Sequence, residues 1–197
     1  MILHTMGLAV SVGNEIDLMI FVLVGRRIDL PDAETVRFPL RNVGLVRNRL
    51  FALLERQPAG RLVCSAACGA DLLALEAAGQ LGWRRFVILT FDRARFRDTS
   101  VMDRPGDWGA LYDRILDEVD SAGDLQVEST PPGRDAYAFA NHRVLEEAGR
   151  MAAGSGQSPT AVVVWDGIDY SPDDLTGLFE AAAQTRGMRV LHVSTLE

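Results

Sequence analysis

The stretch Arg61-Leu-Val-Cys-Ser-Ala-Ala-Cys-Gly-Ala-Asp-Leu-Leu-Ala-Leu-Glu76 decides the fold. It begins with a short apolar run, Leu62 to Cys64, which is too brief for a helix and typical of a buried parallel strand. Five small residues follow, and the leucines after them predict a helix that ends at Gly79 or Gly82. A strand, a small-residue turn and a helix N-terminus form a pocket floor, because free N–H groups and the helix dipole point at whatever lies above.

This turn supplies the first candidate ligand-binding residues, which are Ser65, Ala66, Ala67, Cys68 and Gly69. Asp71, in the first turn of the helix, either complements the helix dipole or binds a hydroxyl group such as that of a ribose, and the sequence leaves both open. The chain has two cysteines, so neither a disulfide framework nor a zinc site is expected. We expect Cys64 and Cys68 to be small buried residues, with a reactive thiol at Cys68 as the alternative.

Composition limits the classes of function. A chain of 197 residues with 48% hydrophobic and 24% charged residues is typical of one globular domain. The net charge of −7 and the pI of about 5.0 argue against binding a long nucleic acid, although a local basic pocket for one small anion remains open. The three histidines are scattered, so no metal site is expected, and no cofactor is expected either.

The N-terminus gives no targeting signal, because residues 1–12 lack a basic start and acidic residues follow at once. We expect residues 1–15 to be an extension, whether ordered or disordered, and 16–197 to be a single domain. No apolar run approaches the length of a membrane span, so a cytoplasmic protein is expected.

Apolar runs and helical spacings alternate along the rest of the chain. Strands are expected at 16–24, 62–64, 85–90, 125–127, 161–164 and 188–193. Helices are expected at 43–54, 70–79, 108–119 and 135–151, and a last one from an N-cap at Ser171, with Pro172 first, to near Gly187. Arg93 to Pro105 is rich in charge without periodicity, which predicts a long loop acting as a lid, a partner surface or a disordered flap.

This alternation predicts an α/β fold, with a doubly wound, mainly parallel, Rossmann-like sheet and right-handed crossovers. Ligands bind such sheets outside the carboxyl ends of the strands, where the strand order reverses. Three unusual loops belong to that edge: Gly25 and its successors, the turn at 65–69, and Trp165-Asp166-Gly167. No G-x-G-x-x-G fingerprint is present, so an ordinary NAD site is not expected.

Two further places carry polar candidates. Arg26 and Arg27 follow the first strand and offer forked donors for a phosphate or carboxylate; alternatively they face solvent or pair with Asp29 and Asp32. Asn141 lies on the apolar face of its helix and needs a hydrogen-bond partner, which is either a backbone carbonyl or a ligand.

The sequence resembles the SLOG (SMF/DprA–LOG) superfamily of Rossmann-like nucleotide-binding domains over residues 18 to 193. Four pieces carry the resemblance: Gly25-Arg-Arg-Ile-Asp29, Ser65-Ala-Ala-Cys-Gly-Ala-Asp71, Tyr137 followed by Asn141, and Trp165-Asp-Gly167. The resemblance implies a nucleotide or a nucleotide-derived ligand at these loops. Some members are sensor domains, the lonely-guy branch cleaves the N-glycosidic bond of nucleoside monophosphates, and the DprA branch binds single-stranded DNA.

The lonely-guy motif P-G-G-x-G-T-x-x-E is only partly present. The matching stretch is Pro172-Asp-Asp-Leu-Thr-Gly-Leu-Phe-Glu180, which keeps the proline and the glutamate but replaces the glycine pair with two aspartates. Two carboxylates would repel a phosphate there, which argues against hydrolase activity. The resemblance places Thr176 and Gly177 at the ligand and makes Glu180 the acid/base candidate, with Arg143 as its partner.

These observations predict a module that binds a nucleotide or an ADP-ribose-like ligand, with an arginine at the phosphate, Asp71 and Asn141 at the ribose or base, and Trp165 as a wall. The alternative is an N-glycosidase that releases the base from a nucleoside 5′-monophosphate. DNA binding is disfavoured by the acidic charge, and a scaffold is not excluded. We also expect a homo-oligomer, with residues 93–105 as a contact surface.

Overall fold

The structure is a computed structural model that describes residues 19–129, 134–153 and 157–197. The expected extension at residues 1–15, and residues 16–18 of the first expected strand, lie outside the described residues. No helix in the described part of the chain is long and apolar enough to cross a membrane.

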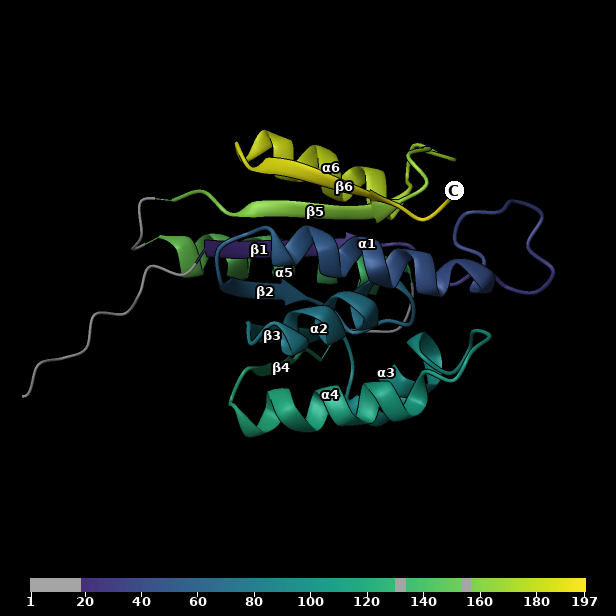
Figure 1. The fold of residues 1–197 in the computed structure, drawn as a ribbon, viewed down its shortest axis with the longest axis horizontal. Coiled ribbons are helices and arrows are strands. Elements are labelled where there is room, and N and C mark those ends of the chain that lie inside the picture. Colours follow the sequence, from purple (N-terminus) through teal and green to yellow (C-terminus); the bar gives the residue numbers. More distant parts are fainter. Residues whose placement is uncertain (1–18, 130–133, 154–156) are drawn as a thin grey trace, which may run out of the picture.

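The described residues form one six-stranded sheet in which every recorded strand pair is parallel (Figure 1). The strands are β1 (Met19–Gly25), β2 (Gly60–Cys64), β3 (Arg84–Leu89), β4 (Leu125–Val127), β5 (Thr160–Trp165) and β6 (Arg189–Ser194). Their order across the sheet is β4-β3-β2-β1-β5-β6. The predicted doubly wound, parallel α/β fold is therefore confirmed.

The strand order reverses between β1 and β5. From β1 the chain builds outward through β2, β3 and β4, and it then returns to the other side of β1 with β5 and β6. Gly25 pairs with Val164, so the loops after β1 and β5 leave the sheet side by side. The small-residue turn after β2 lies at the same edge, as the sequence predicted.

Helices cover both faces of the sheet (Figure 1). They are η1 (Leu40–Asn42), α1 (Val43–Glu55), α2 (Ala70–Gln80), α3 (Arg93–Ser100), α4 (Gly109–Ser121), α5 (Arg134–Ala152) and α6 (Leu175–Thr185). Alternate β1 residues face opposite ways, as the pleat requires: Phe21 and Leu23 join the core under α1, α2 and α4, whereas Ile20 and Val22 join the core under α5 and α6.

The helix α2 is buried almost all round, which explains its nearly continuous apolar sequence. Small residues let it approach the sheet closely. A Cβ atom added at Gly25, the last residue of β1, would lie 2.4 Å from the Cβ atom of Ala70 at the start of α2. Glycine at this position therefore allows the first helical turn of α2 to lie against the carboxyl end of β1.

The prediction of a loop over residues 93–105 is wrong for its first part, because residues 93–100 form α3. Asp92 caps this helix by accepting a hydrogen bond from the Arg95 amide at 3.0 Å. Phe96 and Ser100, one helical turn apart, are the buried positions of α3. The helix buries so narrow a stripe that its charged sequence shows no apolar periodicity.

The predicted start of the last helix is also wrong. The helix α6 begins at Leu175 rather than after Ser171, and its N-cap is Asp174, whose side chain accepts a hydrogen bond from the Thr176 amide at 3.0 Å. Ser171 instead forms a turn, since its carbonyl accepts a hydrogen bond from the Asp174 amide at 2.9 Å.

Candidate ligand-binding site

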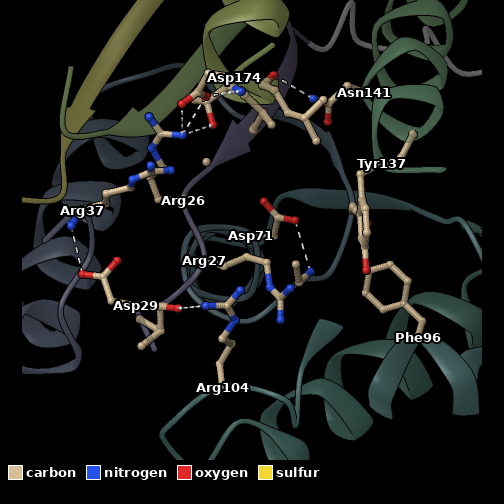
Figure 2. Close-up of a pocket in the computed structure, with 18 of the residues that line it drawn as sticks. Arg26, Arg27, Asp29, Arg37, Asp71, Phe96, Arg104, Tyr137, Asn141 and Asp174 are labelled. Atoms are coloured by element: carbon tan, nitrogen blue, oxygen red, sulfur yellow. Dashed lines mark hydrogen bonds and ion pairs between the residues drawn. The ribbon is translucent and has the colours of Figure 1, made fainter. Parts of the chain in front are cut away.

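A cavity of about 420 Å³ lies at the carboxyl edge of the sheet, where the strand order reverses (Figure 2). Segments far apart in the sequence line it: the loop after β1, the turn after β2, α3, α5 and the start of α6. Eight of the predicted ligand-binding residues line it, namely Gly25, Arg26, Arg27, Ser65, Ala67, Asp71, Asn141 and Thr176.

Arg26 is buried and fully engaged within the protein. Its Nε donates to Asp166 at 3.2 Å, its Nη1 to Asp174 at 2.7 Å, and its Nη2 to the carbonyl of Ile168 at 2.8 Å. The guanidinium also lies 5.5 Å from the centre of the Trp165 ring. All three nitrogen atoms have acceptors in the protein, so Arg26 fixes the loop after β5 and the start of α6 to the end of β1.

This network changes the expected role of Asp174, the second aspartate of the pair at 173 and 174. Burial raises the pKa of Asp174, but the hydrogen bond and the charge of Arg26 outweigh burial, and the pKa of Asp174 lies below its usual value. Asp174 is thus an ionised carboxylate neutralised by Arg26, rather than a free negative charge facing a ligand. The expected repulsion of a phosphate by Asp174 is therefore wrong.

Arg27 has the opposite environment, although it is the next residue. Its Nη2 forms an ion pair with Asp103, and the same carboxylate lies 3.6 Å from the Nε of Arg104. Two guanidinium groups therefore share one carboxylate. The Nε atoms of Arg27 and Arg104 are both buried without a hydrogen-bond partner among the described residues. The predicted alternative, pairing of these arginines with Asp29 and Asp32, is wrong for Arg26 and Arg27 in the described structure.

Asp29 and Arg37 shape the rim of the cavity beside this pair. The Asp29 carboxylate accepts hydrogen bonds from the amides of Arg37 and Phe38, both at 2.9 Å, and so closes the loop between β1 and η1. The guanidinium of Arg37 lies over the Tyr170 ring, 4.1 Å from its centre. Arg37 adds a further positive charge to the lining.

Asp71 projects into the middle of the cavity, opposite Arg27 (Figure 2). It is only 8% exposed, and its Oδ2 accepts a hydrogen bond from the Ala67 amide at 3.2 Å. Burial raises the pKa of Asp71 from 3.8 to about 7, against the opposing effects of that hydrogen bond and of the Arg27 charge. Near neutral pH the carboxyl group is therefore present in both protonation states, and it can donate or accept a hydrogen bond.

Two of the five amides in the turn at 65–69, which the sequence predicted to cradle a ligand, are engaged within the protein, as is the next amide, that of Ala70. The Ala67 amide donates to Asp71, the Cys68 amide to the carbonyl of Ser100 at 3.0 Å, and the Ala70 amide to the carbonyl of Arg26 at 3.2 Å. Gly69 has a φ of 95°, and a Cβ atom there would meet the Arg26 carbonyl at 2.9 Å. The turn thus packs beneath the loop after β1, and the cationic side chains of the lining are donors that an anion can reach.

The two cysteines are buried, as predicted, and neither forms a disulfide. Burial raises the pKa of the Cys68 thiol despite the nearby Arg27 charge, which argues against the reactive alternative. Ala66 is fully buried, and neither Ala66, Cys68 nor Gly69 lines the cavity.

An aromatic wall closes the side of the cavity opposite Arg26. Phe96 from α3 and Tyr137 from α5 lie next to each other, and the Tyr137 hydroxyl is 3.1 Å from Ser100 Oγ (Figure 2). Asn141, one helical turn after Tyr137, donates from Nδ2 to the Leu175 carbonyl at 3.0 Å. The predicted backbone partner of Asn141 is confirmed, and no hydrogen bond to its Oδ1 is found among the described residues.

The remaining candidates lie outside the lining. Trp165 is not a wall of the cavity but stacks on Arg26, Asp166 holds Arg26, and Gly167 forms the turn beyond them. Gly177 faces Asp169, where a Cβ atom would lie 1.8 Å from the Asp169 Oδ1.

The predicted catalytic pair is not brought together. Glu180 contacts Gln184, one turn later in α6, at 3.0 Å and His192 of β6 at 3.1 Å. Arg143 pairs with Glu128 at 3.1 Å and Glu146 at 2.6 Å. Neither Glu180 nor Arg143 lines the cavity.

Sequence reasoning missed several lining residues, above all Phe96 and Arg104, because both lie in the segment expected to be a loop. Asp92 as an N-cap, with Phe96 and Ser100 four residues apart, is the signal that would have revealed α3. Within the described part of the chain, no group of three or more acidic, histidine or cysteine side chains is arranged to hold a metal ion.

Comparison with known proteins gives a distant likeness in fold. No protein-family model and no curated protein matches the sequence. Among solved structures, the chain is similar to DNA processing protein A from Streptococcus pneumoniae, with 12% sequence identity and a TM-score of 0.41. The match covers 90% of this chain and 59% of that chain, so this chain spans less than two thirds of that protein. Such a likeness says nothing about ligand or activity.

Proposed function

We propose that the cavity binds a nucleotide or a nucleotide-derived ligand, and that the protein acts as a ligand-binding or sensor module. One observation carries the proposal: a cationic pair with surplus charge, Arg27 and Arg104, faces the same cavity as the buried carboxyl group of Asp71. A ligand that suits both must combine an anionic group with hydroxyl groups, as a nucleotide does. The site's position at the reversal of strand order supports the proposal.

The cavity lining suggests how such a ligand would lie. Arg27 and Arg104 would take the phosphate, because a guanidinium matches the geometry of phosphate oxygens. Asp71 would bind ribose hydroxyls, and the base would lie against Phe96 and Tyr137, with the Oδ1 of Asn141 near its polar edge. The volume of about 420 Å³ falls among those of small-molecule sites, which are roughly 300–1,000 Å³.

The alternative, release of a base from a nucleoside 5′-monophosphate, now depends on a different residue. Glu180 and Arg143 lie away from the cavity, so neither supports catalysis there. Asp71 is the acid/base candidate within the cavity, since a carboxyl group with a pKa of about 7 can transfer protons at neutral pH. Binding without hydrolysis is the function we favour, because neither residue of the predicted catalytic pair lines the cavity.

The test is titration calorimetry with AMP, adenosine and ribose 5-phosphate against the wild type and the Arg27→Ala variant. We expect AMP to bind the wild type and to lose about 10- to 100-fold in affinity in the variant, because a hydrogen bond to a charged group contributes roughly 1.5–3 kcal/mol. The matched control is Arg114→Ala, which removes an exposed arginine of α4 that pairs with Glu76 and Glu118. This control should leave AMP affinity unchanged.

Two results would change the conclusion. If AMP and other common nucleotides and nucleotide sugars neither bind nor raise the melting temperature, the proposal is wrong, because binding to the native state must stabilise it. If chromatography of the incubated mixture shows free base, and Asp71→Asn abolishes its release, the glycosidase alternative replaces simple binding.

A further inference from the structure

We propose that Asp103 is an internal competitor for the anionic group of the ligand: its carboxylate occupies Arg27 and Arg104, and a bound phosphoryl or carboxylate group displaces it. The inference rests on the proposed function and adds a regulatory device to it. Binding would then put the anion in the place of Asp103 between Arg27 and Arg104, and would free the Asp103 side chain in the segment 101–108, which joins α3 to α4.

The charge balance of this cluster favours exchange. Asp103 pairs with Arg27 and lies 3.6 Å from Arg104, so a single negative charge serves two guanidinium groups. The buried Nε atoms of both arginines have no hydrogen-bond partner among the described residues. A phosphate carries more charge and more acceptor oxygens than one carboxylate. It can therefore accept more hydrogen bonds from the guanidinium groups of Arg27 and Arg104 than Asp103 does.

The exposure of the pair makes the exchange inexpensive. The side chains of Arg27 and Asp103 are 23% and 35% exposed, and ion pairs with this access to water contribute little to stability. The network of Arg26 differs, because its side chain is 9% exposed and those of Asp166 and Asp174 are 0% and 4% exposed. Of the two adjacent arginines, Arg27 is the one whose partner an entering anion can replace.

The segment that carries Asp103 is fixed at both ends and held by polar contacts in between. Val101 is fully buried, and the indole Nε1 of Trp108 donates to the Pro105 carbonyl at 2.9 Å. Between these anchors, the contacts to the loop after β1 are the Asp103 ion pair with Arg27 and a hydrogen bond of 3.4 Å from Arg104 to the Ile28 carbonyl. An anion that engages both arginines would take over the role of the Asp103 carboxylate and keep the segment tied to the loop after β1 through Arg104.

The experiment compares the wild type with Asp103→Asn, using AMP and adenosine as probes in titration calorimetry at low salt. We expect Asp103→Asn to raise AMP affinity about threefold to fivefold and to leave the affinity for adenosine unchanged. Asp107→Asn is the matched control, because Asp107 is exposed in the same stretch and no ion pair among the described residues joins it to Arg27 or Arg104. The control reports the general effect of removing a negative charge and should change AMP affinity less than twofold.

Hydrogen exchange then tests displacement directly. Without AMP, amide exchange in peptides covering residues 101–108 should be higher in Asp103→Asn than in the wild type, and AMP should lower it in Asp103→Asn, because the anion takes the place of the lost carboxylate between Arg27 and Arg104. Lower or unchanged AMP affinity in Asp103→Asn overturns the competition, as does an equal gain in Asp107→Asn or exchange in Asp103→Asn that AMP does not lower. These outcomes leave nucleotide binding intact, whereas absence of AMP binding to both proteins overturns the competition and counts against the proposed function.

Discussion

Arg26 and Arg27 are neighbours in sequence, yet they belong to two different halves of the same cavity. Arg26 is buried, and three different acceptors engage its three nitrogen atoms. Arg27 is partly exposed and shares one carboxylate with Arg104. In the first half, every side-chain nitrogen of Arg26 has an acceptor in the protein, and this saturated network holds the fold together. In the second half, one carboxylate faces two guanidinium groups, which leaves a net positive charge. The position of an arginine in a motif therefore does not show whether it is available to a ligand. The hydrogen-bond and ion-pair partners of its side chain show this.

The alternation of an extended chain explains the difference. Successive residues leaving a strand point to opposite sides. Arg26 reaches the side of the loop after β5 and the start of α6, where Asp166 and Asp174 are buried. Arg27 reaches the other side, toward the turn after β2 and the segment between α3 and α4, where Asp103 is the carboxylate at hand.

The largest expected effect comes from breaking the saturated half. Arg26→Ala would leave two buried carboxylates without their cation, and we expect a loss of about 3–5 kcal/mol in the free energy of unfolding. Arg27→Ala, the matched control, should lose at most about 1 kcal/mol, because its pair is exposed. Urea denaturation followed by circular dichroism measures both. Equal losses in the two variants would mean that the two halves do not differ in the way the structure indicates.

A second prediction uses the pH dependence of Asp71. Because its folded pKa of about 7 lies above the ordinary value of 3.8, the folded state binds the proton more tightly than the unfolded chain. Its contribution to stability is therefore present below pH 3.8 and is lost as the pH rises from 3.8 through about 7. Asp71→Asn keeps an acceptor for the Ala67 amide and removes the titration.

We expect Asp71→Asn to stabilise the protein at pH 8 by up to about 4 kcal/mol relative to the wild type, and to bring a much smaller gain at pH 5. Urea denaturation of both proteins at the two pH values measures the difference. A gain that does not depend on pH would show that Asp71 is ionised throughout this range. Asp174 gives the opposite sign, because its pKa is lowered and its stabilising effect is lost only in acid.

The sequence predicted the strands and the edge of the sheet where the cavity lies, because apolar runs and small residues are local signals. The small-residue turn, Gly25 and the start of α2 were found for this reason. The partners of Arg26 lie 140 to 148 residues away, and no local pattern reveals such a pairing. The predicted role of Glu180 came from the resemblance alone, whereas that of Trp165 came from its place at the end of a strand at the ligand-binding edge, and the structure places both outside the lining.

The smallest expected effect concerns α3, the helix that local patterns failed to indicate. Its N-cap, Asp92, is exposed and accepts a hydrogen bond from the Arg95 amide. Asp92→Ala should lower the free energy of unfolding by about 1 kcal/mol, whereas Asp92→Ser, which retains a capping oxygen, should lose much less. Asp98→Ala is the control for removing a charge from the same helix, since Asp98 is exposed and away from the cap.

This prediction also bears on the unsaturated half of the cavity. α3 supplies Phe96 to the lining, and the carbonyl of Ser100 accepts the amide of Cys68 in the turn after β2. Fraying from the N-terminus would therefore loosen the aromatic wall before it reaches that second contact. Hydrogen exchange in Asp92→Ala should rise in the first turn of α3 and stay low for the Cys68 amide. Equal exchange in Asp92→Ala and Asp98→Ala would show that the cap does not hold the wall in place.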